Sequence, residues 1–183
     1  ISKYVYCATD DMVMRDLMMV EAMNGNTLRI HVHADSGISE GINDPRYAEY
    51  ADQMGLYLMW QTPAWIREGE LWNIGIDDYP LYMRQVYNHP SIVVWGLSNE
   101  ITMNGENDPD LLSNHYELNE LVHGMDKTRL TTMACVSMCS MDAEYVQIPD
   151  TVSYNHYFGW YGGDTSMNGP WFDKFHAKFP NKP

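Results

Sequence analysis

A short apolar segment that ends in two polar side chains is the part of the chain best suited to carry chemistry. Residues 92–95 read Ile-Val-Val-Trp, which is typical of a strand buried on both faces, and the Asn-His-Pro sequence at 88–90 interrupts any helix before it. The segment leads to Asn99 and Glu100. The carboxyl ends of parallel strands are where α/β domains place their chemistry, and a buried carboxyl group is costly unless it is used or paired. We therefore interpret Glu100 as a catalytic carboxyl group.

Strand and helix patterns alternate along the whole chain. This alternation predicts an α/β fold whose βα units share one parallel sheet. The predicted strands cover residues 27–32, 56–60, 129–136 and 151–155, and a further strand begins at 92 and has its tip at Asn99 and Glu100. The predicted helices run from Asp10 or Asp11 to Asn24, then over 45–54, 79–87, about 111–125 and about 169–179, and the first is expected to bury Val13, Leu17, Met18 and Val20. A long loop over 61–75 is expected to carry function. No linker interrupts residues 1–183, so we predict a single domain.

Composition narrows the classes of partner. The 183 residues include 45% hydrophobic side chains and six tryptophans, which is enough to build a core. A formal charge of −14 argues against nucleic acid or an anionic membrane as partner and favours a neutral substrate. No apolar run approaches the length that spans a membrane. Three cysteines form no disulfide framework, and aromatic richness is compatible with sugar binding.

The string at residues 88–100, Asn-His-Pro-Ser-Ile-x-x-Trp-x-x-x-Asn-Glu, resembles glycoside hydrolase family 2, the family of β-galactosidases, β-glucuronidases and β-mannosidases. Every fixed position of the family string is present. Residues 154–161, Tyr-Asn-His-Tyr-Phe-Gly-Trp-Tyr, and the Asp-Lys-Thr-Arg sequence at 126–129 are also similar to family motifs. The resemblance implies a (β/α)8 TIM barrel, of which this chain would cover about five βα units, the family's strands two to six. It also implies that the chain is a piece of a larger enzyme.

The resemblance implies a retaining exo-β-glycosidase that acts on a glycoside or oligosaccharide without a cofactor. Such enzymes use two carboxyl groups about 5–5.5 Å apart, one as acid/base and one as nucleophile. Glu100 matches the acid/base. The family's nucleophile is a Glu after the seventh strand, which is expected beyond Pro183. Tyr157 matches the residue that hydrogen-bonds this nucleophile, although an aromatic core cluster is the structural alternative for Tyr157 and Trp160.

Further residues match substrate-binding positions of the family. Asn99 matches the residue that holds the sugar 2-hydroxyl, where contacts strengthen in the transition state. Arg29, inside the first predicted strand, needs an anionic partner. The family uses an Arg here to orient the nucleophile, and an ion pair with Asp35 is the alternative. Trp160 would wall the sugar site, and Asn155 belongs to the same string.

Two histidines suggest a different chemistry. His31 and His33 lie on the same face of a strand end, as in the metal sites of amidohydrolase-type barrels. That family would also need a Lys and two more His at later strand ends, where only His156 is available. We therefore predict no metal and expect His33 to line the sugar pocket.

The sequence does not decide which sugar is cleaved. β-Galactosidase is our first choice because it is the commonest activity in the family, and β-glucuronidase is second because residues 157–161 resemble it. A non-catalytic carbohydrate-binding barrel is the alternative from another class, since no nucleophile motif is present. The sequence is compatible with a homo-oligomer and with a periplasmic or extracellular location.

Overall fold

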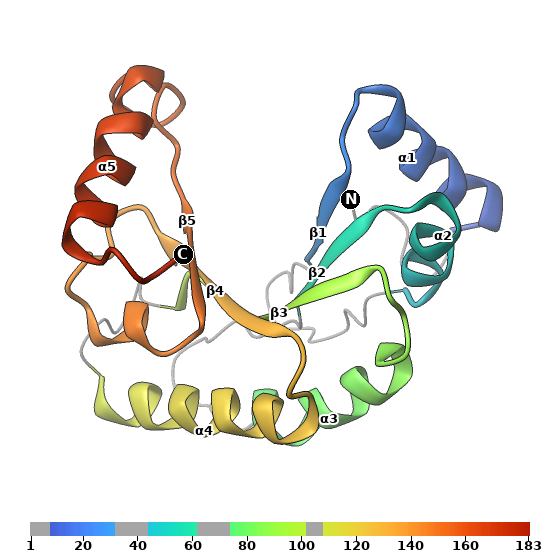
Figure 1. Cartoon of the computed structure of the whole chain (residues 1–183), viewed down its shortest axis with the longest axis horizontal. Helices are drawn as coiled ribbons and strands as arrows, with labels where there is room; N and C mark the ends of the chain where they lie inside the picture. Colours follow the sequence, from blue (N-terminus) through green and yellow to red (C-terminus); the bar gives the residue numbers. More distant parts are fainter. Residues whose placement is uncertain (1–7, 32–43, 62–73, 102–107) are drawn as a thin grey trace.

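Five parallel strands form one sheet, in the order β1-β2-β3-β4-β5, in the computed structural model of the chain. The structure describes residues 8–31, 44–61, 74–101 and 108–183. The strands are β1 (Thr27–Ile30), β2 (Tyr57–Gln61), β3 (Ile92–Asn99), β4 (Leu130–Val136) and β5 (Thr151–Asn155). Figure 1 shows the sheet curling into an open half-barrel. The predicted α/β fold, in which five parallel strands alternate with helices, is therefore confirmed.

Helices cover the convex side of this half-barrel (Figure 1). They are α1 (Asp10–Ala22), α2 (Arg46–Met54), α3 (Ile74–Val86), α4 (Pro109–Met125) and α5 (Asn168–Lys178), with short 3-10 helices η2 (Glu144–Gln147) and η3 (Thr165–Met167). Side chains cap the N-termini of α1 and α4: Thr9 accepts from the Met12 amide at α1, and Asp108 accepts from the amides of Asp110 and Leu111 at α4. None of the helices in the described ranges has the length and hydropathy that spanning a bilayer requires.

Two clusters of buried side chains make up the core. The first packs α1, α2, α3 and α4 against β1, β2 and β3, and its fully buried members include Leu17, Leu58 and Trp95. The second lies around β4, η2 and α5 and includes Tyr145 and Phe175. β3 and β4 pair directly, so the sheet joins the two clusters.

The strand that was predicted to bring Asn99 and Glu100 to its tip is confirmed, since β3 runs to Asn99, with Gly96 paired to β2 and Asn99 paired to β4. Several element boundaries differ from those predicted. α3 begins at Ile74, well before residue 79, and continues through Pro80, so part of the predicted loop over 61–75 is helical. Met18 was predicted to be buried but is 56% exposed, since α1 turns only Val13 and Leu17 fully into the core.

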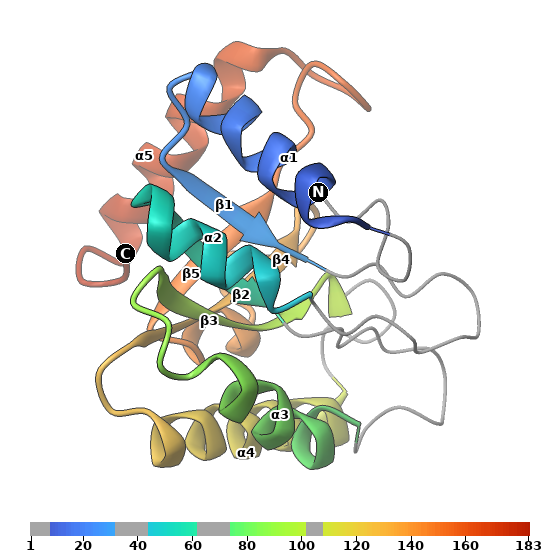
Figure 2. The same cartoon turned by 90° about the vertical axis from the view of Figure 1, so that its right-hand side faces the viewer.

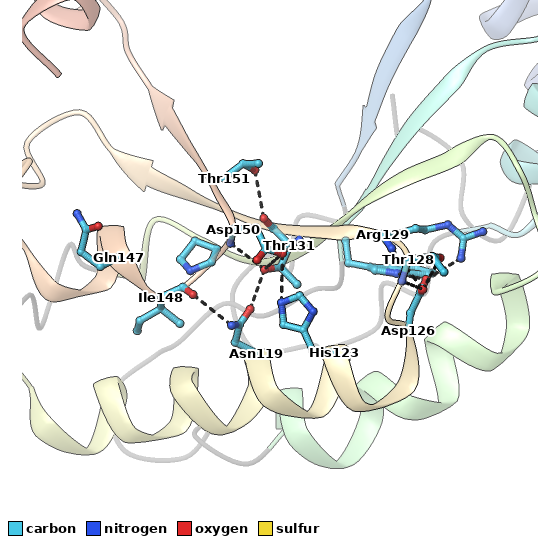
Figure 3. Close-up of polar contacts among 12 residues, drawn as sticks. Asn119, His123, Asp126, Thr128, Arg129, Thr131, Gln147, Ile148, Asp150 and Thr151 are labelled. Atoms are coloured by element: carbon cyan, nitrogen blue, oxygen red, sulfur yellow. Dashed lines mark hydrogen bonds and ion pairs between the residues drawn. The ribbon is translucent and has the colours of Figure 1, made fainter. Parts of the chain in front are cut away.

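The Asp-Lys-Thr-Arg motif ties the start of β4 to β3. Asp126 is fully buried and accepts hydrogen bonds from Trp95 Nε1 at 2.9 Å and Arg129 Nη1 at 2.7 Å. Arg129 Nε also donates to the Ile92 carbonyl at 2.6 Å. Burial alone would raise the pKa of Asp126, but hydrogen bonds from Thr128, Trp95 and Arg129 hold it well below its ordinary value. The ion pair of Asp126 and Arg129 therefore lies at the end of the half-barrel where the strands begin (Figure 3).

A second polar network links α4 to the β4–β5 connection (Figure 3). Asp150 accepts from the Thr131 amide at 2.8 Å and lies 3.1 Å from His123 Nε2. Thr131 Oγ1 donates to Asn119 Oδ1 at 2.7 Å, and Asn119 Nδ2 donates to the Ile148 carbonyl at 3.1 Å. Both networks lie where strands begin. The parallel order places the carboxyl ends of all five strands together at the opposite rim (Figure 2).

Candidate active site

Glu100 follows directly on the last residue of β3 and adopts an unusual backbone conformation. Its amide donates to the Ala134 carbonyl of β4 at 2.8 Å, so the residue stays attached to the sheet. Its φ is 53°, in the left-handed region that side-chain-bearing residues rarely enter. Such a conformation costs about 1–3 kcal/mol and is concentrated at functional sites. The fold therefore holds this carboxylate in a strained, defined position.

Two donors from the far strand meet the Glu100 carboxylate. Asn155, the last residue of β5, donates from Nδ2 to Glu100 Oε1 at 2.8 Å. Tyr157, two residues further along, donates its hydroxyl to the same oxygen at 3.3 Å. Period-two alternation brings residues 155 and 157 to the same face. The hydrogen bonds of the described residues thus engage Oε1 and leave Oε2 for a substrate.

Arg29 joins the ends of four strands on the inner face of the half-barrel. Its guanidinium donates to Asn99 Oδ1 at 2.6 Å, Gln61 Oε1 at 2.8 Å and Asn155 Oδ1 at 3.3 Å. Asn155 Nδ2 also donates to Asn99 Oδ1, at 3.0 Å. These amide oxygens are neutral, so the positive charge of Arg29 remains available to the Glu100 carboxylate and to an anionic group nearby.

Charge and burial act in opposite directions within this cluster. Burial lowers the pKa of Arg29, while the charges of Glu100 and Tyr157 act to raise it. Burial raises the pKa of Tyr157, and the Glu100 carboxylate raises it further. Tyr157 therefore keeps its proton near neutral pH and can act as the hydrogen-bond donor that Glu100 requires.

Gln61 belongs to this site but was not identified from the sequence. It ends β2, is 1% exposed, and accepts from Arg29 Nε. It is paired with Gly96 of β3, where an added Cβ would lie 2.7 Å from the Gln61 Cβ. The signal was available, because a polar residue at the end of a buried strand is the same pattern that singled out Asn99.

The structure brings together five of the predicted site residues: Arg29, Asn99, Glu100, Asn155 and Tyr157. Tyr157 was predicted to contact the nucleophile, and the contact seen here is with Glu100. Trp160 is 80% exposed and lies beside Tyr161 in the turn after β5, apart from these hydrogen bonds.

His33, predicted to line the pocket, and Asp35, the alternative partner of Arg29, lie outside the described residues. Among the residues that are described, no three His, Cys, Asp or Glu side chains gather in a group that could hold a metal ion. The hydrogen bonds of the described residues bring no second carboxylate to Glu100. The cluster therefore offers one carboxyl group with two neutral donors and a guanidinium, which suits proton transfer to a bound substrate.

Known proteins resemble this chain in sequence and in structure. The profile of the family described as "Glycosyl hydrolases family 2, TIM barrel domain" matches residues 6–183. A β-glucuronidase of Bacteroides fragilis is 29% identical over 178 residues, covering 85% of this chain and 25% of that protein. A β-galactosidase of Leuconostoc mesenteroides is 31% identical over 109 residues, covering 54% of this chain and 10% of that protein.

The crystal structure of an FMN-binding β-glucuronidase from Facaelibacterium prausnitzii L2-6 superposes with a TM-score of 0.84 at 34% identity, covering 96% of this chain and 26% of that one. The chain thus spans about a quarter of the length of such relatives. The match over 6–183 agrees with the half-barrel fold: the chain belongs to glycosyl hydrolase family 2 and forms part of the TIM barrel domain of that family.

Proposed function

We propose that this chain is part of the catalytic barrel of a retaining exo-β-glycosidase in which Glu100 is the general acid/base. The observation that carries the proposal is the geometry of Glu100, which is held at the tip of β3 by two hydrogen bonds to one carboxyl oxygen. Family membership supports the same reading, because the string that ends in Glu100 resembles the one that carries the acid/base glutamate of that family.

The arrangement suits a two-step displacement. Glu100, protonated on Oε2, gives its proton to the glycosidic oxygen while a second carboxylate attacks the anomeric carbon and the bond to the leaving group breaks. Glu100, now ionised, then takes a proton from the water that releases the sugar. Asn155 and Tyr157 donate to Oε1 throughout, which directs the exchangeable proton to Oε2. The attacking carboxylate is expected from the family pattern outside residues 1–183.

We propose β-glucuronides as the substrate class. The support is the similarity to β-glucuronidases over most of the chain, at 85% of its length for the Bacteroides protein and 96% for the solved structure. β-Galactosides, the first choice from the sequence alone, are the second candidate. The observation in their favour is the similarity to the Leuconostoc β-galactosidase, which covers a smaller share of the chain at 31% identity. Initial rates of the whole protein on 4-nitrophenyl β-glucuronide and β-galactoside decide between them.

The role of Glu100 is tested with the Glu100→Gln variant on two substrates that share one sugar. An amide cannot supply a proton, so the rate on an alkyl glycoside should fall by about 10²–10⁴-fold. The rate on a nitrophenyl glycoside should fall less, because that leaving group departs without protonation. Glu117→Gln, on the exposed side of α4, is the matched control. Equal losses on both substrates would contradict the acid role, and sugar binding without turnover by the wild type would favour a non-catalytic barrel.

A further inference from the structure

A ladder of stacked aromatic rings runs along one face of β5 and its continuation. Tyr154, His156 and Phe158 alternate along the chain and so share a face. The His156 ring lies nearly parallel to Tyr154, at 5.3 Å and 7°, and to Phe158, at 4.8 Å and 15°. Trp171 and Phe172 of α5 meet the same ring edge-on, at 4.3 and 5.5 Å. His156 is therefore enclosed by four aromatic rings.

The two neighbours of His156 in sequence face the candidate active site. Asn155 Nδ2 donates to Glu100 Oε1 at 2.8 Å, and the Tyr157 hydroxyl donates to the same oxygen at 3.3 Å. β5 ends at Asn155, so Tyr157 is not held by strand pairing of its own. Residues 155–157 thus carry the His156 ring on one side of the backbone and both donors to Glu100 on the other.

Ring stacking is the main contact of His156 with the described residues. Both of its nitrogens are buried, and neither has a partner among the residues that the structure describes. Burial lowers the pKa of His156 below its ordinary value, so the ring is neutral near pH 7. The ring therefore contributes through packing, because it stacks between Tyr154 and Phe158 and contacts Trp171 edge-on.

We propose that His156 is a positioning residue for the acid/base. Its ring anchors the backbone between Asn155 and Tyr157 to α5, so that both donors reach one oxygen of Glu100. The inference rests on the proposed role of Glu100 and adds to it a side chain that touches neither Glu100 nor the substrate.

The test compares His156→Ala with His156→Phe in the whole protein. Alanine removes both stacking contacts, and a misplaced donor pair should lower the rate on an alkyl glycoside by about tenfold or more while affecting a nitrophenyl glycoside less. Phenylalanine restores the stack and should return the rate to within about threefold of the wild type. In a Tyr157→Phe background, His156→Ala should cost less than it does in the wild type, since the two changes act on the same contact.

Phe175→Leu is the control for a merely structural role. Phe175 is 1% exposed and packs on Tyr154 and Trp171 in the same aromatic cluster. This variant should lower the melting temperature and leave the ratio of alkyl to nitrophenyl rates unchanged. An unchanged ratio in folded His156→Ala, or the same fall in Phe175→Leu, would overturn the proposal.

Hydrogen exchange provides a readout that does not depend on activity. Amides of residues 154–161 should exchange faster in His156→Ala and at the wild-type rate in His156→Phe. If the wild type hydrolyses no glycoside, the proposed function fails, while faster exchange in His156→Ala still supports anchoring by the ring. Unchanged exchange in His156→Ala would overturn the anchoring itself.

Discussion

His115 should make the stability of this domain depend on pH in a way that a single substitution removes. It lies on α4, is 1% exposed, and meets the Tyr145 ring edge-on at 5.9 Å. Nδ1 lies 3.0 Å from the Leu111 carbonyl, whereas Nε2 has no partner among the described residues. Burial lowers the pKa of His115 from 6.5 to about 4, so the native state holds a neutral ring.

The magnitude follows from this difference in pKa. Below pH 6.5 residue 115 is protonated in the unfolded chain but stays neutral in the folded chain, so the free energy of unfolding falls as the pH falls. With about 1.4 kcal/mol for each pH unit between 6.5 and about 4, the loss at pH 4 amounts to about 3 kcal/mol. Above pH 6.5 both states are neutral at this residue and the contribution is constant.

The variant His115→Phe keeps an aromatic ring against Tyr145 and removes the titrating group. The free energy of unfolding is measured in urea at pH 7.5, 6, 5 and 4 for the wild type and the variant. Between pH 7.5 and pH 4, the free energy of unfolding of the variant should rise by about 3 kcal/mol relative to that of the wild type. His176→Phe, on the exposed side of α5, is the matched control and should show no such gain. A wild-type-to-variant difference that stays constant across the range would refute the reasoning.

Two further predictions concern opposite rims of the half-barrel. Gly96→Ala places a Cβ 2.7 Å from the Gln61 Cβ, which should displace Gln61 from Arg29. Steady-state kinetics should then show kcat/KM lowered by about tenfold. An unchanged kcat/KM would show that the close approach of Gly96 to Gln61 is unimportant. Asp126→Asn leaves Arg129 facing a neutral group in a buried network and should destabilise the domain by about 3–5 kcal/mol in urea unfolding, with kcat unchanged at low temperature. A change in kcat without a loss of stability would contradict that assignment.

Local pattern was sufficient to predict the succession of elements. Alternating strand and helix patterns predicted five βα units, and the β-branched run at 92–95 correctly placed the start of β3, although Val93 is exposed there. The errors concern single boundaries and faces. The helix before β3 was predicted to begin at residue 79, yet α3 begins at Ile74 and continues through Pro80, and Met18 was predicted to be buried but is exposed.

The candidate site was predictable as a set of residue types but not as a geometry. Glu100, Asn99 and Tyr157 stand in recognisable strings, so their identities were within reach of the sequence. The contact between Arg29 and Asn155 joins residues from the two edge strands, and only the curl of the sheet brings these edges together. Gln61 stands at the end of a buried strand as Asn99 does, but its hydrogen bond from Arg29 becomes visible with the structure.

The two core clusters described above have a consequence for how activity is lost on warming. Arg29 and Asn99 stand on strands that the first cluster supports, whereas Asn155 stands on β5, which packs with the second. The site therefore draws residues from strands that pack on two different core clusters, which meet along β3 and β4. A partial opening between the two clusters would separate Asn155 and Tyr157 from Glu100 while each cluster keeps its own packing. Inactivation should then precede the main unfolding transition, and the catalytic rate becomes a probe of the cohesion between the two parts of the half-barrel.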